Sequence, residues 1–173
     1  FNFPNIDLAS NVTIKSSLFA LTPNPNSATF TMSVSGQGST VISIPGITPS
    51  SHSSFALQRF GNLSFLPNSG AFSVGLTYNK PMGIKSMGYL DYLEVNCRRN
   101  LRMVGNQMDF RDVNSVGAGN VSKFILQDAA LVEEVWDVTN PWDSKNIVFT
   151  RSGINLEFGQ TTDSLRTFCA YKA

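Results

Sequence analysis

Two apolar, β-rich stretches of the chain each carry a carboxylate beside aromatic side chains. The first is 88–93, which contains Asp91, and the second is 135–141, which contains Trp136 and Asp137. A carboxylate in an aromatic cleft is a candidate general acid or base, because an apolar setting changes its proton affinity. Hydrolytic chemistry would also need a nucleophile or a base nearby, so the rest of the chain decides whether these carboxylates are catalytic.

A nucleophile–base pair is hard to assemble from this sequence. Its single imidazole is His52, in a Ser-rich loop, and its two thiols are Cys97 and Cys169, which are flanked by strand-like residues. A cysteine peptidase needs a thiolate activated by an imidazole, and a serine triad meets the same shortage of histidine. No Gly-x-Ser-x-Gly elbow is present. We therefore assign no catalytic and no cofactor-binding residue and expect this chain not to be an enzyme by itself.

The two cysteines are better explained by packing than by chemistry. Cys97 and Cys169 are far apart in sequence and lie among apolar residues, which favours two half-buried small hydrophobic side chains. A single disulfide stays open as an alternative in an extracytoplasmic protein.

Metal binding has weak support in the sequence. One histidine and two separated cysteines give no recognisable zinc spacing. Four acidic residues surround a turn and could supply oxygen ligands to calcium, but an exposed acidic strand with a turn-capping aspartate explains them better. We assign no metal site. The four residues are Glu133, Glu134, Asp137 and Asp143.

Turn chemistry offers a structural explanation for the second stretch. Proline removes a backbone donor and fixes φ, so Pro141 is expected to end a strand. Asp137 or Asn140 then folds back onto nearby backbone amides. The sequence thus predicts a structural motif at a corner of a β-domain, made of Asp91, Trp136, Asp137, Thr139 and Pro141.

Aromatic side chains suggest one binding function. Trp136 lies between valines and is expected in the core, where its replacement by alanine would cost about 3–5 kcal/mol. Trp142 follows the proline and is the candidate for an exposed aromatic contact, with Tyr89 and Tyr92 as further members of a platform for sugar rings. A carbohydrate-binding or adhesin module is therefore the alternative to a noncatalytic accessory domain.

Composition limits the classes of protein that remain. The 173 residues are 42% hydrophobic but only 14% charged, and the net charge is +1. This balance gives no electrostatic reason to expect a nucleic acid partner. The one basic cluster, Arg98, Arg99 and Arg102, is expected to be solvated or paired. No apolar run reaches the roughly 18 residues of a membrane helix, and the start at Phe1 suggests a fragment of a longer protein.

Short alternating segments at intervals of about eight to twelve residues predict an all-β protein with little helix. This many short strands favour a two-sheet, jelly-roll-like β-sandwich, and we expect one domain over 1–173. Residues 88–95 could be a helix or a strand, and the strand is favoured. A hairpin is expected around 151–153. The expected strands are 11–15, 28–34, 40–44, 55–60, 63–66, 71–78, 88–95, 107–111, 121–126, 131–138, 147–150, 154–158 and 165–171.

An ordered set of motifs resembles a known family. The set comprises 88–101, 107–111 and 135–141, and it is joined by 78–79 and 165–168. Together they resemble the region upstream of the peptidase domain in PorU-type sortases of the type IX secretion system, which are gingipain-like cysteine peptidases. The resemblance is good over residues 72–171 and looser before them.

The resemblance implies a noncatalytic β-domain whose parent has its catalytic Cys and His in a domain after Ala173. An alanine is usual in the family where this chain has Cys97, which agrees with a small buried side chain there. The implied partners are the adjacent peptidase domain, the C-terminal domains of secretion cargo and an outer-membrane β-barrel shuttle protein. The implied location is extracytoplasmic, at the bacterial outer membrane or cell surface, where the parent would cleave cargo and join it to a lipopolysaccharide anchor.

Overall fold

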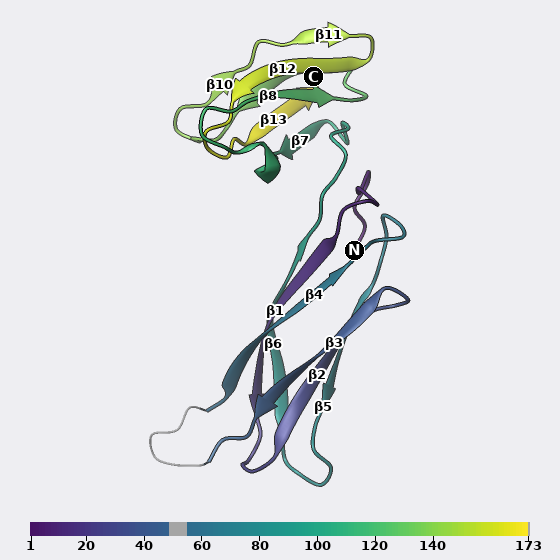
Figure 1. Cartoon of the computed structure of the whole chain (residues 1–173), viewed down its shortest axis with the longest axis vertical. Helices are drawn as coiled ribbons and strands as arrows, with labels where there is room; N and C mark the ends of the chain where they lie inside the picture. Colours follow the sequence, from purple (N-terminus) through teal and green to yellow (C-terminus); the bar gives the residue numbers. More distant parts are fainter. Residues whose placement is uncertain (49–54, 173) are drawn as a thin grey trace. The chain divides into compact units, whose positions relative to one another are not determined.

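The computed structural model describes residues 1–48 and 55–172, and regular structure within them is almost entirely β (Figure 1). The predicted all-β sandwich with little helix is confirmed, since the described part holds one short 3-10 turn, η1 (Val113–Ser115). None of its helical structure is long and apolar enough to span a membrane. Residues 1–48 and 55–172 form thirteen strands: β1 (Val12–Leu21), β2 (Ser27–Val34), β3 (Gly38–Pro45), β4 (Leu57–Phe65), β5 (Val74–Asn79), β6 (Met87–Asn96), β7 (Gln107–Phe110), β8 (Val121–Leu126), β9 (Val132–Asp137), β10 (Lys145–Asn146), β11 (Thr150–Ser152), β12 (Asn155–Thr161) and β13 (Phe168–Lys172).

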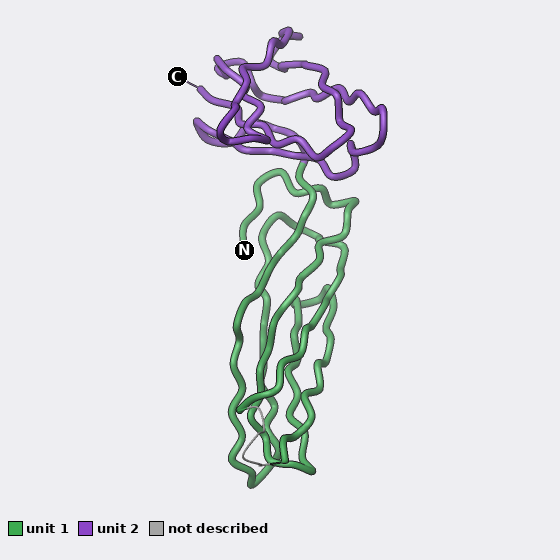
Figure 2. Tube along the Cα trace, turned by 90° about the vertical axis from the view of Figure 1, so that its left-hand side faces the viewer, with its two compact units in different colours: residues 1–99 green, residues 100–173 purple. Residues whose placement is uncertain are grey.

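The chain divides into two compact units, unit 1 (Phe1–Arg99) and unit 2 (Asn100–Ala173), coloured separately in Figure 2. Each unit has its own hydrophobic core, and no residue belongs to both. The sequence predicts a single sandwich domain over 1–173, whereas the structure forms two sandwiches along this length. Hydrophobic alternation identifies strands without saying which of them pair, and the boundary has no Pro-, Gly- or Ser-rich linker to reveal it.

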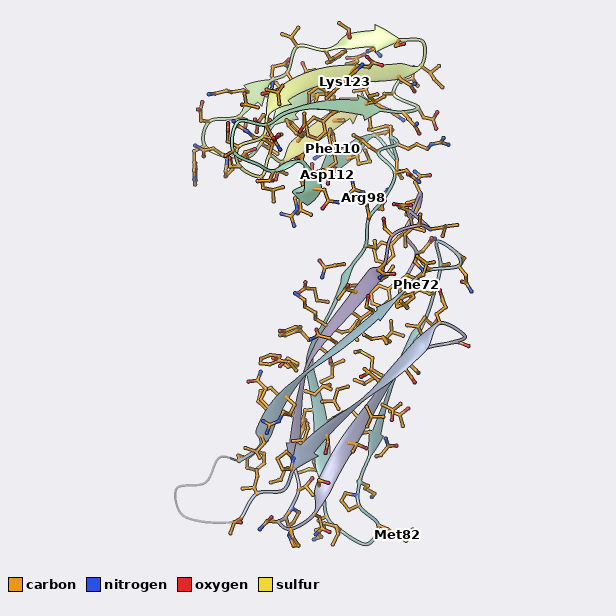
Figure 3. The ribbon with its side chains drawn as sticks, in the orientation of Figure 1. Phe72, Met82, Arg98, Phe110, Asp112 and Lys123 are labelled. Carbon is orange, nitrogen blue, oxygen red and sulfur yellow. The ribbon has the colours of Figure 1, made fainter. Side chains whose placement is uncertain are left out.

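Unit 1 is built from two three-stranded sheets with the orders β4-β1-β6 and β3-β2-β5. Strand β2 and the second half of β4 bury every second residue, as half-buried strands do. In β2 the buried face carries Phe30, Met32 and Val34, as the alternation predicts. Near one end of the unit, Phe72 meets the edge of Phe65 with ring centroids 5.2 Å apart, and Figure 3 labels Phe72 there.

Strand β4 is longer than the sequence suggests. Two short strands around a turn at Gly61 are expected, but one continuous strand, Leu57–Phe65, is formed. Gly61 lies in its interior opposite Ser16, and a Cβ there would come within 2.7 Å of Ser16 Oγ and 2.8 Å of the Ile42 side chain. The glycine therefore serves close packing between β4, β1 and β3 rather than a turn.

Strand β6 resolves the helix–strand ambiguity in favour of the strand, because Met87–Asn96 pairs with β1 along its length. The register shifts once: Ser17 faces Tyr92 and the next residue, Leu18, faces Leu90. Asp91 is the extra residue, so it lies in a β-bulge.

Unit 2 contains a four-stranded sheet of order β10-β9-β13-β7 and a three-stranded sheet of order β11-β12-β8. Its core centres on four phenylalanines, Phe110, Phe124, Phe158 and Phe168, whose ring centroids are 4.9 to 6.4 Å apart. The expected hairpin forms with its turn at Gly153, whose φ of 62° favours glycine. With three or four strands per sheet, neither unit has the eight strands of a complete jelly-roll in the described residues.

Candidate functional site

Asp137 ends strand β9 and is buried, with 7% of its surface exposed. Its Oδ1 accepts a hydrogen bond of 2.9 Å from the Thr139 backbone N–H. Its Oδ2 accepts one of 3.3 Å from Arg166 Nη1, which also forms an ion pair with it. The side chain therefore makes the local turn that the sequence predicts, and a charged partner neutralises it.

Arg166 connects the two sheets of unit 2. It binds Asp137 of β9, and its Nε donates a hydrogen bond of 3.2 Å to the backbone carbonyl of Thr161, the last residue of β12. Strands β9 and β12 belong to different sheets. We name this group of Asp137, Thr139, Thr161 and Arg166 the corner cluster. Because its charged groups already have partners, it is suited to holding the sheet ends together.

The segment after Asp137 is fixed in the same way. Thr139 Oγ1 accepts a hydrogen bond of 3.0 Å from the Thr167 N–H, and Asn140 Oδ1 accepts one of 3.1 Å from the Trp142 N–H. Both side chains proposed for turn formation, Asp137 and Asn140, make such bonds, so this prediction is confirmed. Pro141 lies beyond the last residue of β9, as expected for a residue that cannot continue the ladder.

Sequence reasoning did not identify Arg166 and Thr161 as the partners of Asp137. It placed 165–168 among the family motifs without assigning a contact. The charge of Asp137 was the one indication that it has such a partner, because a buried carboxylate needs a cation or several hydrogen-bond donors. Which of the arginines supplies that cation is decided by the pairing of strands.

Trp136 corrects a prediction. Its side chain is half-buried and is absent from the core cluster, whereas the adjacent Val135 is fully buried. Alternation along β9 places Val135 inward and Trp136 on the outer face, beside Cys169 of β13. The indole Nε1 donates a hydrogen bond of 2.8 Å to Glu134 Oε2, so this N–H has a partner two residues away on the same strand.

Trp142 is 95% exposed, as the sequence predicts. Tyr89 and Tyr92 are also partly exposed, but they belong to unit 1 whereas Trp142 belongs to unit 2. None of the aromatic contacts found within the described residues involves Trp142. The three rings considered for a sugar platform therefore come from two different units.

Three of the four acidic residues considered for calcium each have a partner of their own. Glu134 accepts from Trp136, Asp137 pairs with Arg166, and Asp143 forms an ion pair of 3.4 Å with Lys145. In residues 1–48 and 55–172 no group of three potential metal ligands is assembled.

Both cysteines are free and half-buried, so the packing interpretation is confirmed and the alternative disulfide is not formed. Burial raises the pKa of the Cys169 thiol from its ordinary 9.0 to about 11, and a hydrogen bond from the thiol to Asp109 and the charge of Asp109 act in the same direction. Burial also raises the pKa of Cys97, opposed by the charge of Arg99. His52, the only imidazole, lies outside the described residues.

The basic cluster is divided between the units and is partly paired. Arg99 Nε donates a hydrogen bond of 2.7 Å to the Pro4 carbonyl, and Arg102 forms an ion pair of 3.3 Å with Asp128. Arg98 and Arg99 belong to unit 1 and Arg102 to unit 2. The expectation of a paired face is confirmed for Arg99 and Arg102.

Two successive sandwiches, the second with a buried ion-paired corner, define a β-sandwich protein. No protein-family model and no curated protein matches this sequence. The fold does match a solved structure. The crystal structure of dimeric latent PorU from Porphyromonas gingivalis superposes on this chain with a TM-score of 0.75 and 19% sequence identity. The superposition covers 97% of this chain and 16% of that one, so this chain spans a small part of the PorU length. At this identity the likeness shows the fold.

Proposed function

We propose that this chain is a noncatalytic accessory β-module of a gingipain-like cysteine peptidase, a sortase of the type IX secretion system. The main observation in support of this proposal is the structural match to PorU over 97% of the chain at a TM-score of 0.75. The ordered motifs within residues 72–171 support the same assignment, because they resemble this family in their residues and not only in their fold.

The corner cluster supports a structural role for the module. Its carboxylate and its guanidinium group are occupied by each other and by backbone groups. Both thiols have raised pKa values, which disfavours the nucleophilic thiolate form. In this proposal the motif stiffens the module, and the chemistry belongs to a peptidase domain elsewhere in the parent protein.

The proposal also names partners and a location. The module supports the adjacent peptidase domain or contacts the C-terminal domains of secretion cargo and an outer-membrane β-barrel shuttle protein. Its place is extracytoplasmic, at the bacterial outer membrane or cell surface.

The test begins with the parent gene. A Cys/His peptidase domain encoded after Ala173 supports the proposal, and its absence contradicts it. The chain itself, incubated with peptides that copy cargo tails, is expected to show no cleavage. Cleavage that survives the combined changes Cys97→Ala and Cys169→Ala would reveal an active site that the proposal does not contain.

The competing function, a carbohydrate-binding or adhesin module, has a direct test. Glycan-array binding by the chain, abolished by Trp142→Ala and kept by Tyr171→Ala, would replace the accessory proposal. Tyr171 is a suitable control because it is also a partly exposed aromatic of unit 2. We expect no glycan binding that depends on Trp142.

A further inference from the structure

A hollow of about 340 Å³ opens on the surface of unit 1. It is lined by Phe19 of β1, by two residues just before β4, and by three consecutive residues of β6. The full lining is Phe19, Phe55, Ala56, Tyr89, Leu90 and Asp91. Three aromatic rings and one carboxylate thus meet at one small apolar site.

The β-bulge explains why three consecutive residues line the same hollow. In a regular strand, Leu90 would point to the face opposite Tyr89 and Asp91. The extra residue at Asp91 breaks the alternation and turns neighbouring side chains together, as bulges do. The exposures agree, because Tyr89, Leu90 and Asp91 are all exposed. The unusual carboxylate of this strand is therefore placed beside aromatic rings by the backbone itself.

Asp91 has no hydrogen-bond or ion-pair partner among the described residues. Its carboxylate makes no hydrogen bond and no ion pair with the rest of the described residues, unlike Asp137, which has both. The bulge also removes it from the pairing with β1. Asp91 thus contributes negative charge to the hollow, and no described residue forms an ion pair with it.

This chemistry favours an organic cation. Aromatic faces attract cations through their quadrupoles, and an adjacent carboxylate adds a direct charge interaction. A calcium or magnesium ion would require several oxygen ligands, and the hollow supplies one carboxylate. A guanidinium or ammonium group at the end of an apolar stem matches both the apolar walls and the acidic rim.

We propose that this hollow binds an arginine or lysine side chain presented by a partner polypeptide. The position of β6 favours a polypeptide over a free amine, because β6 is an outer strand of the sheet β4-β1-β6. The main chain of a partner can approach such a strand while its side chain enters the hollow. The proposal stands on unit 1 alone and does not depend on the accessory function proposed above.

The experiment is a titration of the full chain followed by backbone amide NMR. The probe is N-acetyl-L-arginine methylamide, and the matched control is N-acetyl-L-citrulline methylamide, which has nearly the same shape without the charge. We expect saturable shifts at Phe19, Tyr89, Leu90 and Asp91, with half-saturation on the order of millimolar for one side chain. Citrulline is expected to produce much weaker shifts at these amides.

Variants assign the binding to the hollow. Asp91→Asn is expected to weaken arginine binding about two- to fivefold, the range of an exposed charge pair. Phe55→Ala, outside the strands, is expected to weaken it by a similar two- to fivefold through the lost ring face. Glu94→Gln changes an exposed carboxylate of the same strand that does not line the hollow, so it should leave binding unchanged.

Three results would overturn the proposal: equal binding of arginine and citrulline, shifts confined to other surfaces, or equal weakening by Glu94→Gln and Asp91→Asn. The amide spectrum of each variant shows whether it is folded. If Asp91→Asn disturbs the bulge, Phe55→Ala decides the matter, and unchanged arginine binding by that variant rejects the hollow.

Discussion

Unit 1 and unit 2 are both two-sheet sandwiches, but they hold their sheets together differently. Unit 1 has nine charged residues among its 99, whereas unit 2 has sixteen among its 74. The buried polar side chains of unit 1 are the hydroxyls of Ser16, Ser17 and Thr22. Unit 2 buries the hydroxyl residue Thr162 and, in addition, the carboxylate of Asp137, which pairs with Arg166.

The two units also differ in the length of their strands and in the side-chain links between their segments. Strands β1 and β6 of unit 1 have ten residues each, whereas the longest strand of unit 2, β12, has seven. Both units contain a cluster of four phenylalanines, and unit 2 adds arginines that bridge separate segments. Arg151, for example, donates hydrogen bonds to the carbonyls of Ala129, Ala130 and Val132. The short strands of unit 2 are thus supplemented by side-chain links that involve charged groups.

The largest expected effect comes from the phenylalanine cluster of unit 2. Phe168 is 0% exposed and contacts three other rings, so Phe168→Ala should cost about 3–5 kcal/mol of unfolding free energy. Both tryptophans, Trp136 and Trp142, lie in unit 2, so their fluorescence during chemical denaturation reports on this unit.

The matched change in unit 1 is Leu18→Ala, since Leu18 is also fully buried. It should cost about 2–5 kcal/mol, seen by far-UV circular dichroism, while the tryptophan transition stays in place. If Leu18→Ala moves the tryptophan transition as far as Phe168→Ala does, the two cores do not unfold separately.

The next effect concerns the corner cluster. Asp137→Ala removes the acceptor for Thr139 N–H and the partner of Arg166, and should cost about 2 kcal/mol, as for hydrogen bonds to a charged group. Lys145→Ala breaks an exposed pair with Asp143 and should cost less than about 1 kcal/mol. Denaturant titration measures both costs. If they are equal, the buried corner cluster stabilises the fold no more than an exposed ion pair does.

Trp136 gives a smaller effect than the sequence suggests. Because the side chain is half-buried on an outer sheet face, Trp136→Ala should cost about 1–2 kcal/mol rather than the core value. Trp136→Phe keeps much of the apolar contact and loses the hydrogen bond to Glu134, so it should cost less. If Trp136→Ala lowers the unfolding free energy by about 3 kcal/mol or more, the side chain is packed as a core residue.

The smallest expected effect concerns the pKa and the reactivity of the Cys169 thiol, with Cys97 for comparison. Cys169 has a pKa of about 11, so the folded state holds its proton more tightly than the unfolded chain does. Its contribution to stability is complete below pH 9 and is lost as the pH rises through about 11. Asp109→Asn should lower this pKa and speed alkylation of Cys169 by iodoacetamide at a fixed pH near 9.

Cys97 supplies the control for that measurement, because the variant Asp109→Asn lies in the other unit. Its alkylation rate should stay unchanged. Mass spectrometry of the labelled peptides separates the two sites. Unchanged alkylation of Cys169 in Asp109→Asn would show that burial alone sets its reactivity.

Local pattern accounted for much of the fold and for the turn at the corner. Alternation in β2 gave the correct buried face, and Pro141 with Asp137 and Asn140 gave a strand end closed by side chains. These features depend on residues a few positions apart, so the sequence contains them directly.

Other features depend on which strands pair, and only the tertiary structure decided them. The division at Arg99–Asn100, the inner position of Gly61 and the outer position of Trp136 follow from which strands lie side by side. The same holds for the surroundings of the two carboxylates that first suggested chemistry. By its own residues the chain determined an all-β protein with two unusual carboxylates. Only the folded structure gave Asp137 an arginine from a distant segment and placed Asp91 at a bulge beside open aromatic rings, because both depend on contacts between residues far apart in sequence.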